Sequence, residues 1–170
     1  PAAYRDLAGV VEATLPDGPL DGIGFSLGAR TLLELAIRRP ERFRRLVVAG
    51  VGANLFRSSG SDAIARAIRG GAPPEDPVAR YFAGLAAEPD QDPEALAALM
   101  EAGNGPLDPA ELVAVTCPTL VVLGDQDFAG PADPLVEALP DARLVTLRRT
   151  DHFATPKAFA FMDAALDFLA

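Results

Sequence analysis

Short apolar runs rich in valine, separated by helical patterns, constrain the fold of this chain more than any other feature. Three such runs occupy residues 45–50 (RLVVAG), 119–125 (TLVVLGD) and 143–147 (RLVTL). Continuous apolar runs of this length are typical of strands that are covered on both faces in a parallel sheet. Helical patterns lie over 27–39 and 133–140, and strands that alternate with helices predict an α/β fold. We therefore expect a mostly parallel sheet with helices on both faces.

Two more helices and a weaker strand are expected near the ends of the chain. Apolar residues recur at helical spacing at Tyr4, Leu7, Val11 and Leu15, and again at Met162, Ala165, Leu166 and Leu169. The run LDGIG (20–24) predicts a short strand, although Asp21 interrupts its apolar character. The phenylalanines of the last helix are expected in the core: Phe159, Phe161 and Phe168. The helix over 133–140 is expected to have Asp133 as its N-cap residue.

The middle of the chain, residues 52–116, has a different character from the segments on either side. It contains no convincing strand pattern, and proline and glycine are frequent in it. Three Asp-Pro steps, at Asp76, Asp92 and Asp108, each begin a helical pattern with a good N-cap residue. We interpret 52–116 as a small helical cap inserted into a core made of 1–51 and 117–170. Such a cap would cover a site at the carboxyl edge of the sheet and shape its pocket.

Composition excludes several classes of partner. The chain has 170 residues, of which 49% are hydrophobic, and this is enough for a buried core. The net charge of −9 argues against nucleic acid, because phosphate binding needs clustered lysine and arginine. No apolar run reaches about 18 residues and no secretory signal opens the sequence, so we expect no membrane partner. A single cysteine cannot form an internal disulfide, and this favours a cytoplasmic location. The sequence also has only one histidine, too few ligands for a zinc site, so no metal or cofactor is expected.

The stretch GFSLG (24–28) places Ser26 between two glycines, after a predicted strand and before a predicted helix. A serine hydroxyl is a weak nucleophile and needs a base, which a third group must orient. The only histidine, His152, follows the last predicted strand, and two aspartates, Asp125 and Asp127, follow the strand before it. Because the carboxyl ends of parallel strands meet at one edge, we expect these side chains to lie together. The alternative is that Ser26 is a small residue in a tight turn and that the others are solvated loop residues.

The order serine, acid, histidine resembles that of the α/β-hydrolase family. The resemblance rests on GFSLGA as the nucleophile elbow, PTLVVLGDQD as the strand and turn of the acid, and DHF as the histidine loop. It implies that Ser26 attacks a carbonyl carbon, that His152 is the base, and that Asp127 rather than Asp125 orients the imidazole. It also implies that the backbone N–H of Leu27 is one donor of the oxyanion hole.

The sequence departs from the family at its beginning. Only 25 residues precede Ser26, whereas the family has about four strands there and takes its second oxyanion donor from a loop after one of them. The first residue is also proline rather than methionine. We therefore expect the chain to be the C-terminal part of the fold, with a missing N-terminal segment, a partner chain or a homodimer covering the exposed sheet edge.

The function that the resemblance implies is hydrolysis of a carboxylic ester, or a related carbonyl group, of a small molecule through an acyl-enzyme. The same triad also supports perhydrolysis and hydrolysis of carbon–carbon bonds in the family. Two other interpretations are an inactive hydrolase-like module for binding or assembly, and a fragment that is active only when completed. Phe25, which stands where histidine is common in the family, is a candidate to line the substrate pocket, as are Phe128 and Phe153, which flank the acid and the base.

Overall fold

The structure is a computed structural model that describes residues 2–57, 60–71, 75–102 and 105–170. Its helices are α1 (Ala2–Arg5), α2 (Leu7–Glu12), α3 (Leu27–Arg38), α4 (Ser61–Ile68), α5 (Pro77–Ala86), α6 (Pro93–Ala102), α7 (Asp133–Ala138) and α8 (Phe159–Leu169). Its strands are β1 (Leu20–Phe25), β2 (Phe43–Ala49), β3 (Thr119–Gly124) and β4 (Ala142–Leu147). Short 3₁₀ turns occupy Pro40–Arg42, Ala53–Phe56, Pro109–Ala114 and Thr155–Lys157. The chain forms two compact units: Pro1–Leu7 with Ser58–Gly105, and Ala8–Arg57 with Pro106–Ala170.

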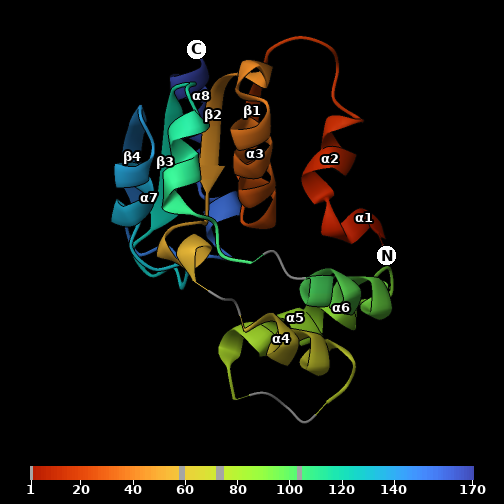
Figure 1. Ribbon diagram of the computed structural model, residues 1–170. Coiled ribbons are helices and arrows are strands. Elements are labelled where there is room, and N and C mark those ends of the chain that lie inside the picture. Colours follow the sequence, from red (N-terminus) through yellow and green to blue (C-terminus); the bar gives the residue numbers. More distant parts are fainter. Residues whose placement is uncertain (1, 58–59, 72–74, 103–104) are drawn as a thin grey trace. The chain divides into compact units, whose positions relative to one another are not determined.

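The second unit is built on a four-stranded sheet in the order β1-β2-β3-β4 (Figure 1). All three pairings are parallel, with Val48 opposite Val121 and Val122 opposite Val145. Both β1 and β4 are edge strands of this sheet. At the start of β1, Asp21 accepts hydrogen bonds from the guanidinium groups of Arg44 and Arg45, which lower the pKa of its carboxyl to about 2. The parallel α/β class expected from the sequence is confirmed.

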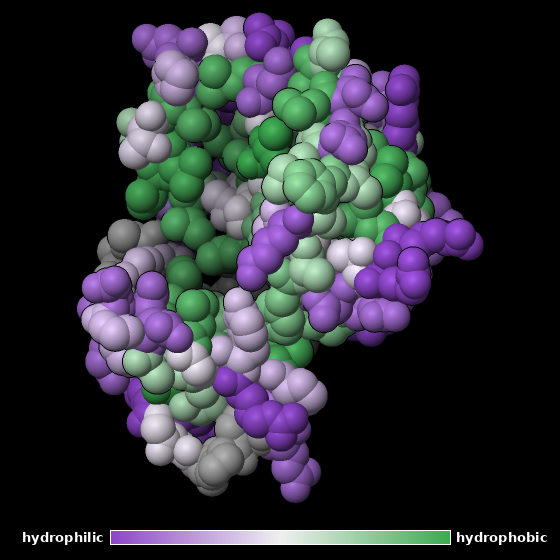
Figure 2. All heavy atoms as spheres, turned by 180° about the vertical axis from the view of Figure 1, so that it is seen from behind, coloured by the Kyte–Doolittle hydropathy of each residue, from purple (hydrophilic) through white to green (hydrophobic). Residues whose placement is uncertain are grey.

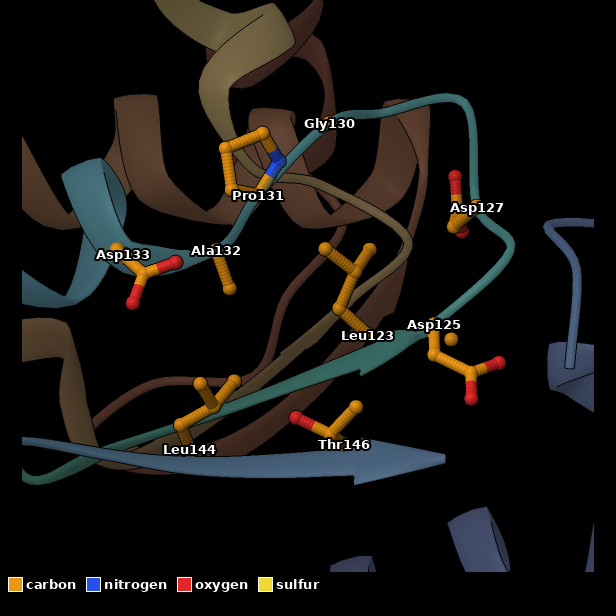
Figure 3. Close-up of a pocket in the computed structure, with 10 residues that line it drawn as sticks. Leu123, Asp125, Asp127, Gly130, Pro131, Ala132, Asp133, Leu144 and Thr146 are labelled. Atoms are coloured by element: carbon orange, nitrogen blue, oxygen red, sulfur yellow. The ribbon is translucent and has the colours of Figure 1, made fainter. Parts of the chain in front are cut away.

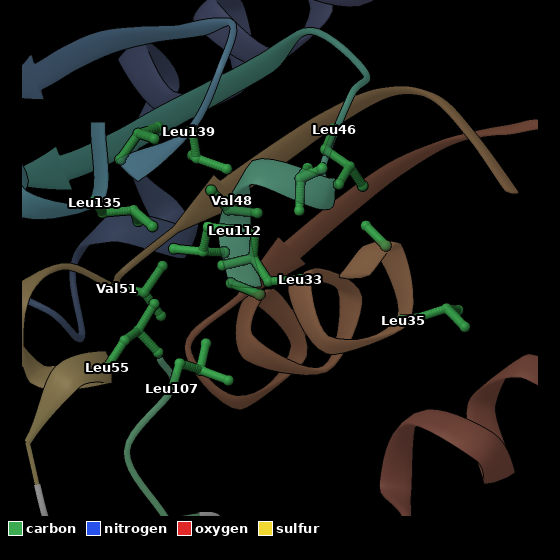
Figure 4. Close-up of a cluster of buried hydrophobic side chains, with 14 of the residues drawn as sticks. Leu33, Leu35, Leu46, Val48, Val51, Leu55, Leu107, Leu112, Leu135 and Leu139 are labelled. Carbon is green, nitrogen blue, oxygen red and sulfur yellow. The ribbon is translucent and has the colours of Figure 1, made fainter. Parts of the chain in front are cut away.

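Helices cover both faces of the sheet, because successive side chains of each buried strand point to opposite sides. In β2, Leu46 and Val48 belong to a core cluster with Leu33 of α3 and Leu135 of α7 (Figure 4). The alternate residues of the same strand join a second cluster that includes Phe161 of α8. In Figure 1, α3 lies in front of the sheet and α8 behind it. The sheet is therefore the middle layer of the unit, as the sequence predicts.

The described residues of the first unit form helices joined by turns and irregular segments, and no strand lies among them. Ala65 and Ile68 of α4 pack with Ala86 of α5 and Ala97 of α6 in a small core of their own. Arg69, which follows α4, pairs with two glutamates of α6, Glu94 and Glu101. The boundaries of the cap at 52 and 116 remain a prediction.

The three Asp-Pro steps cap helical turns, as the sequence predicts. The carboxylates of Asp76, Asp92 and Asp108 accept hydrogen bonds from the backbone N–H groups of Val78, Ala95 and Ala110. The first two begin α5 and α6 in the helical unit. The third begins the 3₁₀ turn Pro109–Ala114, which lies in the sheet-bearing unit.

Two expectations about helices are wrong in detail. The first helix is divided at Asp6 into α1 and α2. The N-cap residue of α7 is Ala132, which makes no side-chain cap, so Asp133 is the first helical residue rather than the cap.

Within the parts of the chain that the structure covers, no helix is long and apolar enough to cross a membrane.

The apolar face of α8 is also not the one expected. Phe161 and Ala165 are buried, whereas Phe159, Met162 and Leu166 are 81%, 42% and 66% exposed. Apolar residues surround this helix on most sides, so periodicity alone does not select the face that packs. Figure 2, seen from the side opposite to Figure 1, shows hydrophobic residues (green) and hydrophilic residues (purple) next to one another on the surface.

Candidate active site

Ser26 lies on a sharp turn between β1 and α3. Its backbone has φ 52° and ψ −114°, a conformation that residues other than glycine rarely adopt. Its N–H donates to the carbonyl of Ala49, which fixes the turn to the end of β2, and its carbonyl accepts the N–H of Arg30 in the first turn of α3. A non-glycine residue held in such a conformation costs about 1–3 kcal/mol and persists only where the surroundings enforce it. A strained strand-to-helix turn is the geometry expected from the resemblance of GFSLGA to a nucleophile elbow.

The two glycines of the GFSLG stretch differ in what they do. A Cβ atom on Gly24 would lie 2.7 Å from Cα and N of Ala29, so α3 can approach β1 this closely only because residue 24 has no side chain. A Cβ atom on Gly28 would meet nothing within 4 Å. Gly24 is therefore a steric requirement of the turn, and Gly28 is not.

His152 lies in the loop after β4, and its side chain is buried, with 4% exposed. Its Nε2 atom lies 3.0 Å from Ser26 Oγ. Its Nδ1 atom lies 3.0 Å from each carboxylate oxygen of Asp127. The structure thus brings together three residues that are 126 and 25 positions apart in the sequence.

The two aspartates that follow β3 have different partners. The side chain of Asp127 is fully buried, and its Oδ1 also accepts the N–H of Ala129 at 2.8 Å, which holds the carboxylate toward His152. Asp125 is exposed and instead accepts the backbone N–H of Thr150 at 3.3 Å. Of the two residues left open by the sequence, it is Asp127 that contacts the imidazole.

These contacts determine the tautomer of His152. An ionised carboxylate has no proton to donate, so the Nδ1–H of the imidazole donates to Asp127. In the neutral ring Nε2 is then an acceptor, and the hydroxyl of Ser26 donates to it. The arrangement can therefore remove the hydroxyl proton of Ser26 as its oxygen attacks an electrophile.

Other residues expected at the site surround this core. Leu27 is the first residue of α3. Its N–H is therefore one of the N–H groups of the first turn, which have no hydrogen-bond partner within the helix. The ring centroids of Phe25, Phe128 and Phe153 lie 4.7, 4.3 and 5.5 Å from that of His152. All three aromatic residues lie against the His152 imidazole, and Phe128 is also 47% exposed.

Gly50 is a residue of the site that sequence reasoning missed. It follows β2 with φ +66°, and a Cβ atom there would lie 2.5 Å from Phe25 Cε2 and 3.1 Å from His152 Cε1. The available signal was a glycine directly after a predicted strand, at the same sheet edge as Ser26 and His152.

A cavity of about 430 Å³ lies next to the acid loop (Figure 3). It is lined by Leu123, Gly124, Asp125, Asp127, Gly130, Pro131, Ala132, Asp133, Leu144 and Thr146. Neither Ser26 nor His152 is among these residues, so the cavity lies beside the acid and not at the serine hydroxyl.

The other reactive groups do not form a second centre. Within the described ranges, no group of three or more histidine, cysteine, aspartate or glutamate side chains is placed to hold a metal ion. Cys117 is buried, and burial raises the pKa of its thiol, as suits a small core residue at the start of a strand.

Comparison with known proteins gives one family. The model of the alpha/beta hydrolase family matches residues 1–164. Similar solved structures include the enol-lactonase from Burkholderia xenovorans LB400 (23% identity, TM-score 0.77, covering 98% of this chain and 72% of that chain). They also include MGS-M2, an alpha/beta hydrolase enzyme from a Medee basin deep-sea metagenome library (20% identity, TM-score 0.75, 97% and 70%). A third is 2-hydroxy-6-oxo-6-phenylhexa-2,4-dienoate hydrolase from Rhodococcus sp. strain RHA1 (24% identity, TM-score 0.58, 85% and 61%). No curated protein sequence matches the chain. The family match extends over nearly the whole chain, and the chain therefore belongs to the alpha/beta hydrolase family.

Proposed function

We propose that this chain is a serine hydrolase that acts on a carboxylic ester or a related carbonyl group of a small molecule. Ser26 is the nucleophile, His152 the general base and Asp127 the acid that orients it. The observation that carries the proposal is the unbroken line of contacts from Ser26 Oγ through the imidazole to a buried carboxylate, each at 3.0 Å.

In the proposed reaction, Ser26 Oγ attacks the carbonyl carbon while its proton passes to His152 Nε2. The tetrahedral intermediate collapses, the leaving alcohol takes that proton, and an acyl-enzyme remains. Water then attacks the acyl carbon as Nε2 accepts one of its protons, and this proton returns to Ser26 Oγ when the acid product leaves. Asp127 remains ionised throughout and stabilises the imidazolium that forms twice in each cycle.

The oxyanion of each intermediate needs hydrogen-bond donors. The N–H of Leu27 is one candidate, because it directly follows the nucleophile at the start of α3. Loss of one donor of such a pair lowers turnover by about 10²–10³-fold. We propose that a further segment, supplied by a preceding part of the chain, by a partner chain or by a second copy, covers the outer edge of β1 and contributes the second donor.

The substrate is proposed only by class. Two of the similar structures are named an enol-lactonase and a dienoate hydrolase, which supports a small carbonyl compound over a polymer. Perhydrolysis and carbon–carbon bond hydrolysis on the same three residues are alternative chemistries. For the location, we propose the cytoplasm, on the basis of a single buried cysteine.

A second candidate function is an inactive module for binding or assembly. It is favoured by an incomplete oxyanion hole, for which the described residues offer the N–H of Leu27 at the start of α3 as the candidate donor. In that case the contacts around Ser26 would be retained from a catalytic ancestor and would have no catalytic role.

A fluorophosphonate probe tests the proposal, because it forms a covalent adduct only with an activated serine. We expect a single adduct, mapped by peptide mass spectrometry to Ser26, and its loss in Ser26→Ala and in His152→Ala. Ser61→Ala, in α4, is the matched control and should be labelled like the parent protein. A folded protein that takes no adduct at Ser26 when the segment that covers β1 is present would refute the hydrolase and favour the binding module.

A further inference from the structure

The base of the proposed triad is a loop residue, and few hydrogen bonds fix the orientation of its imidazole ring. His152 lies between β4 and α8, and its imidazole contacts one group at each nitrogen, Ser26 and Asp127. Rotation about the bond from Cβ to a histidine ring has a broad, shallow preference. When Ser26 carries an acyl group, its hydroxyl no longer donates to Nε2, so only Asp127 remains. Packing must then supply the rest of the orientation.

The ring of Phe25 is in a position to do this. It lies 4.7 Å from the imidazole, centroid to centroid, with an angle of 41° between the planes. Phe25 immediately precedes Ser26 and is held by β1, so one strand end places both the nucleophile and a ring that contacts its base. The same ring also packs in the core cluster beneath α8.

The conformation of Gly50 provides a second, independent observation. A side chain at this position would overlap the Phe25 ring, with a Cβ atom only 2.5 Å from Cε2, and would press on His152 Cε1 at 3.1 Å. The positive φ of Gly50 disfavours other residues as well. The end of β2 is thus shaped so that the Phe25 ring can lie against the imidazole.

We propose that Phe25 is a positioning residue, seated by Gly50, which holds the His152 imidazole with Nε2 toward Ser26 Oγ in the free enzyme and in the acyl-enzyme. The inference rests on the proposed function for its kinetic consequence but not for its structural one. A displaced imidazole would slow proton transfer in both half-reactions without changing substrate binding, and a misplacement of about 1 Å in such a contact costs about 10²-fold in rate.

The test compares Phe25→Ala with variants that separate positioning from core packing. Phe168→Ala is the matched control, since Phe168 is a partly buried phenylalanine of the same core cluster. Phe25→Leu keeps an apolar side chain but removes the ring, and serves if Phe25→Ala does not fold. Phe25→Tyr keeps the ring and should restore the function.

We expect Phe25→Ala and Phe25→Leu to lower kcat on a simple ester, and the rate of fluorophosphonate labelling, about 10- to 100-fold. KM should stay within about twofold, as expected when an interaction acts in the chemical step rather than in binding. Phe168→Ala should lose thermal stability but keep kcat, and Phe25→Tyr should recover most of the loss. Equal kcat losses in Phe25→Ala and Phe168→Ala, or none in Phe25→Leu, would overturn the inference.

A readout without activity separates this inference from the proposed function. His152 is the only histidine, so the imidazole signals in a nitrogen–proton NMR spectrum are its own. We expect the signal of the Nδ1–H that donates to Asp127 to broaden or vanish in Phe25→Leu and to persist in Phe168→Ala. If the parent protein is unreactive but this contrast holds, the proposed function fails and the positioning role stands. If the parent protein is labelled and the Nδ1–H signal is unchanged in Phe25→Leu, the positioning role fails and the proposed function stands.

Discussion

Replacement of Ser26 by glycine should leave a more stable protein than replacement by alanine. Both variants remove the hydroxyl and its contact with His152, so this loss is common to the two. They differ in the backbone: alanine keeps the Cβ atom that makes φ 52° and ψ −114° unfavourable, whereas glycine tolerates positive φ.

The size of the difference follows from two opposing terms. Relief of the strained conformation stabilises the glycine variant by about 1–3 kcal/mol. The greater freedom of glycine in the unfolded chain costs about 0.4–1 kcal/mol. We expect Ser26→Gly to exceed Ser26→Ala in free energy of unfolding by about 1 kcal/mol, or about 2–4 °C in Tm for a chain of this size.

Urea denaturation measures this difference in the free energy of unfolding. When the dependence of that free energy on urea concentration has the same slope in both variants, a change in the midpoint concentration reports stability alone. Gly28→Ala is the internal control with the opposite sign. It lies two residues away, has no positive φ, and has open space for a Cβ atom. Alanine should therefore stabilise this position by about 0.4–1 kcal/mol. If Ser26→Ala proves as stable as Ser26→Gly while Gly28→Ala behaves as stated, the turn at Ser26 is not strained and the elbow argument fails.

Three more predictions concern single carboxylates and the thiol. Asp127→Asn should lower kcat by about 10⁴-fold in the ester assay, since an amide stabilises the wrong tautomer, while the neighbouring Asp125→Asn should stay within about threefold of the parent. Asp21 has a pKa lowered to about 2 by its two arginines, so its stabilising effect is complete above its ordinary value of 3.8 and is lost as pH falls toward 2. The stability gap between the parent and Asp21→Asn, followed by urea denaturation, should therefore close over that interval, and a gap that stays constant would contradict the ion pair. Cys117 should react with a disulfide reagent only in denaturant, because burial raises the pKa of its thiol and blocks access; fast reaction of the folded protein would show that the strand start opens.

The two middle strands of the sheet were predictable because they contain nearly continuous apolar runs, whereas the edge strands β1 and β4 are only partly buried. Thr119–Gly124 is buried at every position, and a strand covered on both faces leaves no polar alternation to confuse with a helix. The presence of the helix α8 was predicted but not its orientation, because its apolar residues do not define a single face. The N-cap residue of α7 was predicted one position too late. The helix begins at Asp133 with Pro134 as its second residue, so the N-cap residue is Ala132.

The residues of the candidate site were predictable for a different reason. Ser26, Asp127 and His152 each follow a strand, and a parallel sheet brings such residues to one edge. Which aspartate faces the imidazole was not fixed by this rule, since Asp125 and Asp127 follow the same strand. The choice depends on the loop geometry, in which Ala129 and Thr150 each donate a backbone N–H to a different carboxylate.

What the sequence could not reveal is how these strand ends fit against one another. Phe25, Gly50 and His152 come from three different strand ends, and no spacing rule links them. Two features at this edge, the positive φ of Ser26 and the missing side chain of Gly50, both place groups around one imidazole. Local strain persists only when the surrounding structure enforces it, and enforced strain collects where geometry matters for function. The joint occurrence of both at His152 is therefore a stronger indication of a working site than the motif alone, because a turn of GFSLG type with no role could relax with a glycine at position 26.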